Sequence, residues 1–162
     1  MDEATFWSMI ESAWQPVGGK AVQRKKLAQG KLSEEAADVL SESLDEVIGS
    51  LHESLEELSA DDLLEFDRIL ERKLYDIDRA EIQRQTQGSD DGFLYARGFI
   101  VIVGRDYYDS VNKNPKIAMM DLECEEMCYI SWNIYRENFG DPPKSEISRE
   151  SHSNKAGWKN AK

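Results

Sequence analysis

Residues 33–67 carry 13 acidic residues and not one lysine or arginine. Apolar residues in the first part of this stretch recur every three or four positions, which is the spacing of one face of an α-helix. On a helix over residues 33–58, at about 100° per residue, the apolar positions fill an arc of about 100° and the acidic positions lie opposite, within about 140°. The apolar positions are Leu40, Leu44, Val47, Ile48, Leu51, Leu55 and Leu58. Such a helix needs a core to cover its apolar face, and it turns a negative face toward water or a partner.

The rest of the chain shows helical periodicity in several shorter segments. Helices are expected over residues 2–14, 59–77 and 121–139, with some helix in residues 17–32. The sequence therefore predicts a fold in which helices pack on helices around one core.

The apolar run of residues 99–103 fits either a buried helix or a buried strand, because periodicity alone does not separate the two. Its β-branched residues favour a strand. Asp90 and Asp91, which precede the segment, are typical caps of a helix and favour the other interpretation.

Chain length limits the number of domains. The 162 residues are enough for one buried core and too few for two comfortable domains. A glycine and two prolines within residues 140–143 end the last helix, and the residues beyond them are polar, basic and poor in core residues apart from Trp158. We predict an all-α, single-domain bundle of about five to six helices over residues 1–142, followed by a flexible polar basic tail over residues 143–162.

The overall charge indicates which partners the chain favours. With 32 acidic and 20 basic residues the formal net charge is −12, so the chain repels a phosphate backbone and favours basic proteins over nucleic acid. No apolar run approaches the ~20 residues of a membrane helix, and no membrane partner is expected. The first residues are acidic and lack the basic and apolar regions of a secretory signal, so we expect a cytoplasmic protein.

Few residues in the sequence are suited to catalysis or metal binding. The histidines, His52 and His152, have no serine or cysteine at a spacing that predicts a nucleophile–base pair. Cys124 and Cys128 lie four apart on an expected helix, without the further ligands of a tetrahedral metal site, and are interpreted as buried, reduced thiols. We therefore expect neither an enzyme nor a metal or cofactor site.

Several short blocks carry a family resemblance. They are Phe6-Trp7, Leu58-Ser59, Phe66-Asp67-Arg68-Ile69-Leu70, Lys73-Leu74-Tyr75, Asp90-Asp91-Gly92-Phe93-Leu94-Tyr95-Ala96-Arg97 and Gly104-Arg105-Asp106-Tyr107-Tyr108. In this order, over roughly residues 1–140, they resemble the bacterial domain-of-unknown-function family forty-two-forty. The resemblance implies an all-helical fold, which favours a helix over residues 99–103. It brings no assigned chemistry, but genes of this kind resemble those of small acidic proteins encoded beside bacterial toxins, which implies an immunity role.

Arg97 and Arg105 lie in these blocks among apolar and aromatic residues. On one continuous helix they would be about 80° apart, so both could reach the same inward-facing carboxylate. The favoured interpretation is a buried ion pair with Asp76, Asp78 or Asp91. The alternative is an anion pocket, which would make the chain a regulatory or sensory domain that binds a small anionic ligand.

The acidic side of residues 33–58 is the most informative candidate for a binding surface. Its acidic residues repeat at i, i+4 without an intervening lysine, and each like-charge pair costs about 0.2–0.5 kcal/mol at low salt. A basic partner would relieve these penalties and would associate faster. We therefore predict a non-enzymatic immunity protein that masks the active site or basic groove of a toxin. Its expected contact residues are Asp38, Glu42, Asp45, Glu46, Glu53, Glu56 and Glu57.

Overall fold

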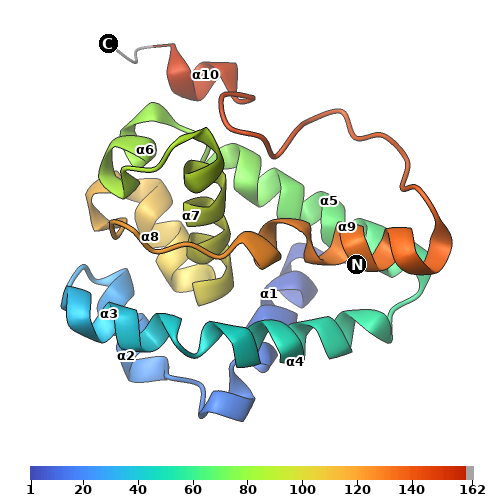
Figure 1. Ribbon diagram of the computed structural model, residues 1–162, viewed down its shortest axis with the longest axis horizontal. Helices are drawn as coiled ribbons and strands as arrows, with labels where there is room; N and C mark the ends of the chain where they lie inside the picture. The colour runs from blue at the N-terminus through green and yellow to red at the C-terminus, as the bar shows by residue number, and fades with distance from the viewer. Residues whose placement is uncertain (160–162) are drawn as a thin grey trace.

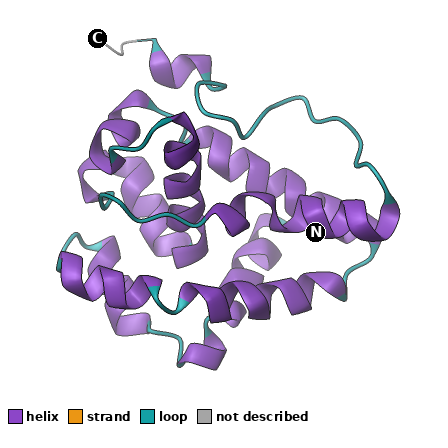
Figure 2. Ribbon diagram, viewed as in Figure 1, coloured by secondary structure: helices purple, strands orange, loops and turns teal. Residues whose placement is uncertain are grey.

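The computed structural model describes residues 1–159, which form helices joined by loops and contain no strand (Figure 2). Two 3-10 helices, η1 (Gln15–Val17) and η2 (Pro115–Ile117), lie among the ten α-helices of this part of the chain. The α-helices are α1 (Glu3–Ala13), α2 (Ala21–Ala28), α3 (Glu34–Ser41), α4 (Leu44–Glu56), α5 (Ala60–Asp76), α6 (Ala80–Thr86), α7 (Asp90–Val103), α8 (Arg105–Lys113), α9 (Glu125–Phe139) and α10 (Lys155–Trp158). The all-α prediction is confirmed.

The predicted number of five to six helices is wrong. The long acidic helix is divided in two, and short helices such as α6, α8 and α10, of four to nine residues, lie outside the ranges for which separate helices were predicted. Helices this short are marginal by themselves, and tertiary packing holds them. Their apolar residues are too few to show a clear period in the sequence.

Helix α7 lies at the centre of the fold, packed against α5, α8 and α9 (Figure 1). Nearly all of its residues are buried, including the whole of residues 99–103. The Ser89 hydroxyl caps its first turn by accepting a hydrogen bond from the Gly92 amide, at 3.2 Å. Residues 99–103 are therefore helical, as the family resemblance implied. No helix in the described residues, α7 included, is long and apolar enough to cross a membrane.

The contact between α7 and α9, the most extensive helix pair of the fold, depends on Gly98. A Cβ atom at this position would lie 2.7 Å from Cys128 Sγ and would overlap the backbone carbonyl oxygen of Cys124. The missing side chain lets the first turn of α9 approach the backbone of α7 directly. Gly98 thus sets the distance between the two helices.

The acidic helix expected over residues 33–58 is interrupted by a turn at residues 42–43, between α3 and α4. Just before the turn, the Ser41 hydroxyl donates to the Asp38 carbonyl oxygen at 2.8 Å, a local bond that competes with regular helix pairing. Leu40 and Leu44, on either side of the turn, are both buried. The turn therefore interrupts the helix but keeps the apolar face on the core.

The segment from Gly140 to residue 159, here called the C-terminal strap, is not the detached flexible tail that was expected. It arches away from the end of α9 and returns to the domain, where it ends in α10 (Figure 1). Arg149 of the strap is 6% exposed, so part of the segment is buried like a core element. The last part of the predicted tail, residues 160–162, lies outside the described residues.

Candidate functional site

All seven residues of the predicted contact face are exposed. They follow α3, the turn after it and α4, which run one after the other along one edge of the molecule (Figure 1). The one ion pair that any of them makes within residues 1–159 joins His52 Nδ1 to Glu56 Oε2 at 3.7 Å. The negative charge of this edge, here called the acidic face, is therefore almost uncompensated by the rest of the described chain.

Two hollows, of about 170 and 240 Å³, lie between the acidic face and the segment that leads into α9. Together we call them the acidic groove. Its apolar lining residues are Ala37, Leu44, Ile48, Met119, Met120, Leu122 and Cys124. Its acidic lining residues are Glu34, Asp38, Asp45, Asp121, Glu123 and Glu126. Among the described residues that line it, none is basic, so the groove joins apolar surface to a negative rim.

Besides Glu34, three acidic residues of the groove, Asp121, Glu123 and Glu126, were not among the predicted contact residues. They come from the loop before α9 and from its first turn. In the sequence they form a dense acidic block within residues 121–126, a signal that the prediction of the contact face did not use. Their placement beside α3 and α4 depends on tertiary packing, because α4 and α9 lie against each other.

Arg97 is completely buried and forms no ion pair with a carboxylate of residues 1–159, so the predicted ion pair with Asp76, Asp78 or Asp91 is wrong. Its guanidinium group donates to the carbonyl oxygens of Leu74, at 2.8 Å, and Arg149, at 3.0 Å, and to Ser151 Oγ at 3.0 Å. Desolvation lowers the pKa of Arg97, and the nearby charge of Asp78 opposes that shift.

Arg105 lies in a different environment from Arg97. Helix α7 ends at Val103, and Gly104, with φ of 121°, separates it from α8, which begins at Arg105. The expected angle of about 80° assumed one continuous helix and therefore does not apply. The Arg105 side chain is exposed and pairs with Asp109 at 3.4 Å. Because the two arginines share no partner, we propose no anion site between them.

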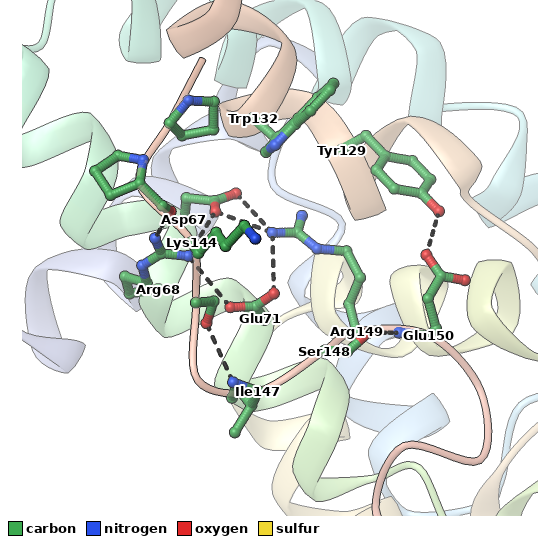
Figure 3. Close-up of a pocket in the computed structure, with 13 residues that line it drawn as sticks. Asp67, Arg68, Glu71, Tyr129, Trp132, Lys144, Ile147, Ser148, Arg149 and Glu150 are labelled. Atoms are coloured by element: carbon green, nitrogen blue, oxygen red, sulfur yellow. Dashed lines mark hydrogen bonds and ion pairs between the residues drawn. The ribbon is translucent and has the colours of Figure 1, made fainter.

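A second polar cluster, which the sequence did not indicate, joins the C-terminal strap to α5 and α9 (Figure 3). Nη2 of Arg149 contacts both carboxylate oxygens of Asp67, at 3.0 and 2.9 Å, and lies 3.7 Å from Glu71 Oε1. Ser131 Oγ donates to Asp67 Oδ1 at 2.9 Å. An open pocket of about 410 Å³ lies beside these groups, with Tyr129 in its wall. No periodicity marks Arg149, since it lies in an extended segment.

Asp78, which is completely buried, receives three hydrogen bonds from the strap. The backbone amides of His152 and Asn154 donate to it at 3.1 and 2.9 Å, and the indole of Trp158 donates at 2.9 Å. The Trp158 ring also packs edge-on against Phe93, with the ring centroids 6.0 Å apart. Together with the Arg97 hydrogen bonds to Arg149 and Ser151, these contacts hold the strap near Asp67, near Arg97 and near Asp78.

Both cysteines are buried and free, and the described residues contain no cluster of side chains suited to hold a metal ion. Burial raises the pKa of Cys124 to about 12 and that of Cys128 even further. Because the thiolate is the reactive form, neither thiol should react with iodoacetamide at pH 8 in the folded protein, whereas both should react in guanidinium chloride. Mass spectrometry would count the adducts, and rapid labelling of the native protein would contradict the buried placement.

Arg24 of α2 forms an ion pair with Glu11 of α1 and a hydrogen bond with the last residue of α7. Arg24 Nη2 lies 2.6 Å from Glu11 Oε2, and Arg24 Nε donates to the Val103 carbonyl oxygen at 2.7 Å. The hydrogen bonds from Arg24 lower the pKa of Glu11. A lowered folded-state pKa contributes stability above the unfolded value of about 4.3, and this contribution is lost as the pH falls through the folded value.

The Glu11→Gln substitution should therefore lower the melting temperature more at pH 7 than at pH 3, because the stability that the ionised carboxylate contributes diminishes as the pH falls below its unfolded-state pKa toward its lowered folded-state pKa. Melting curves followed by circular dichroism at the two pH values test this. Equal decreases at both would mean that the charge of Glu11 contributes nothing.

Comparison with known proteins bears on the fold more than on the site. No curated protein and no solved structure matches the chain. The model of one family, described as protein of unknown function (DUF4240), matches residues 1–137. The match includes α1 to α8 and nearly all of α9, and ends before the C-terminal strap. The chain therefore belongs to the family of proteins of unknown function DUF4240.

Proposed function

We propose that this chain is a non-enzymatic binding protein of the immunity type, which neutralises a basic toxin in the cytoplasm by covering its active site or basic groove. The observation that supports this proposal is the acidic groove together with the acidic face beside it. A negative edge of this kind attracts a basic partner over a distance and orients it.

The apolar lining gives the same surface a source of affinity. Charges at the rim of an interface mainly change the association rate, whereas buried apolar contacts at its centre slow dissociation. Met119 and Met120 line the groove, and methionine adapts its shape to a partner at little cost. Val39, on α3, is 62% exposed and adds apolar surface next to Asp38.

A charge-reversal experiment tests the proposal, with the product of the gene beside this one in its genome as the partner. The groove variant carries Asp38→Lys, Asp45→Lys and Glu126→Lys. A matched control changes the net charge by the same amount at exposed acidic residues outside the groove: Glu65→Lys, Glu137→Lys and Glu146→Lys. Affinities would be measured by titration calorimetry and association rates by surface plasmon resonance, over a series of salt concentrations.

The groove variant should bind at least about ten-fold more weakly, with most of the change at low salt, and the control should change affinity about two-fold or less. Circular dichroism would confirm that both variants fold. Equal affinities for the groove variant and the control would show that the acidic groove is not the contact surface.

A further inference from the structure

The C-terminal strap occupies a groove of its own, separate from the acidic groove. The strap groove is formed by buried charged groups of the domain: Asp67, Glu71, Asp78 and Arg97. Their partners in the strap are the Arg149 guanidinium, the Ser151 hydroxyl, two backbone amides and the Trp158 indole. Every one of the groove groups lies within the family match of residues 1–137, and every strap group lies beyond it.

The contact between strap and groove is polar, which makes it both specific and releasable. A buried ion pair contributes less to stability than apolar packing of the same volume, and in some proteins it fixes which surfaces pair. When the strap leaves, water can hydrate Asp67, Asp78 and Arg97, because each is a charged group. By contrast, the apolar side chains that the strap brings to the domain, Ile147 and Trp158, are only half-buried.

The connection between α9 and Arg149 allows the strap to point away from its own domain. It begins at Gly140, whose φ of 87° suits glycine, and continues through Pro142 and Pro143, which favour extended chain. Figure 1 shows this part arching outward from α9. It passes over the open pocket of about 410 Å³. Its polar contacts to the domain there are exposed ones, from Arg68 to the Pro143 carbonyl oxygen and from Arg136 to Asp141.

We propose that the strap groove is a recognition site for an extended, arginine-bearing segment, and that the strap of a second copy of this chain occupies it in a swapped dimer. In that dimer Arg149 of each copy pairs with Asp67 of the other. The second copy fits because its strap presents the same arginine, serine and tryptophan at the spacing that the groove already accommodates. When two copies exchange identical segments, they form a dimer with two-fold symmetry. The exchanged segments use the same contacts as in the monomer.

Two full-length variants with complementary charge reversals test the exchange. Asp67→Arg reverses the charge of the groove, and Arg149→Asp reverses the charge of the strap. In each variant the groove and the strap therefore carry like charges, both within one chain and within a homodimer. When the variants are mixed, the reversed groove meets the reversed strap and the unchanged groove meets the unchanged strap. A chain carrying both substitutions is the control, because its groove and strap match again.

Native mass spectrometry of the equimolar mixture should show a heterodimer whose dissociation constant is at least about ten-fold below that of either homodimer. The amount of heterodimer in the mixture is compared with the amount of homodimer in a solution of each variant alone. If the heterodimer is no more abundant, the proposal is overturned. Reversal of the acidic face should leave the heterodimer unchanged, so this result is independent of the toxin-binding proposal.

A second measurement avoids the risk that a reversed variant fails to fold. A fluorescent peptide of residues 143–159 is titrated into the full-length chain carrying Arg149→Ala, in which the cis strap is weakened. It should bind at least about ten-fold more tightly than the same peptide with alanine at its arginine position. Equal binding of the two peptides would show that the groove does not recognise the arginine, and would overturn the proposal.

Discussion

Replacing Gly98 with alanine should lower the free energy of unfolding by about 1–3 kcal/mol, the usual effect of one methyl group too many in a packed core. The new Cβ atom would lie 2.7 Å from Cys128 Sγ and would overlap the Cys124 carbonyl oxygen. The sulfur atom can rotate away, but the carbonyl belongs to the backbone and moves only if α9 shifts. The loss should exceed the gain in helix propensity, about 0.5–1 kcal/mol, that alanine brings over glycine.

The matched control is Gly49→Ala in α4. Gly49 is exposed, and a Cβ atom there would meet nothing within 4 Å. This substitution should raise the free energy of unfolding by about 0.5–1 kcal/mol, the opposite sign. Urea denaturation measures both changes in the free energy of unfolding. The midpoint of the transition should change, and the dependence of the free energy on urea concentration should stay constant. If both substitutions stabilised the protein, the close approach of α7 and α9 at Gly98 would be contradicted.

Replacing Arg97 with methionine should lower the free energy of unfolding by roughly 2–4 kcal/mol. Methionine fills most of the space but leaves the carbonyl oxygens of Leu74 and Arg149 without their donor. Leu74 is in the last turn of α5, where carbonyl groups have no partner within the helix. Arg97 therefore caps α5 with a positive charge at its negative end, and its loss also weakens the strap.

Arg105→Met is the control for this substitution, because the sequence alone paired these two arginines. The Arg105 side chain is 59% exposed and its contact is an i, i+4 pair with Asp109, so the change should stay within about 0.5 kcal/mol. Thermal and urea unfolding would be compared for both variants. A large loss at Arg105 would contradict the separate environments that the structure gives the two side chains.

The helices and their faces followed from the sequence wherever the apolar period was long. Leu51 and Leu55 are buried and Glu53 and Glu57 are exposed, as the wheel over residues 33–58 predicts. Burial of apolar surface dominates the placement of an amphipathic helix, and it leaves a repeating signal. The turn at residues 42–43 was not predicted, because the apolar period is the same on both sides of it.

The packing of the strap and the partners of the buried charged residues were not predicted, because they depend on single polar contacts between distant residues. Arg149 and Asp67 are 82 positions apart, and Asp78 binds backbone amides, which every residue type except proline provides. Neither interaction leaves a periodic pattern. The strap therefore resembled a tail in composition, and Asp67 resembled an ordinary member of an apolar helix. Arg97 stood out in the sequence, but its partners proved to be carbonyl oxygens and a hydroxyl instead of a carboxylate.

The order of the strap after α9 in the sequence has a consequence for biosynthesis. Ribosomes add about 5–20 residues per second from the N-terminus, so α1 to α9 have left the ribosome before Arg149 and Trp158 emerge. During that interval the nascent domain holds Asp67, Asp78 and Arg97 in water, with no strap to cover them. On polysomes, where several copies emerge side by side, the first arginine-bearing segment to reach an open groove can come from a neighbouring chain.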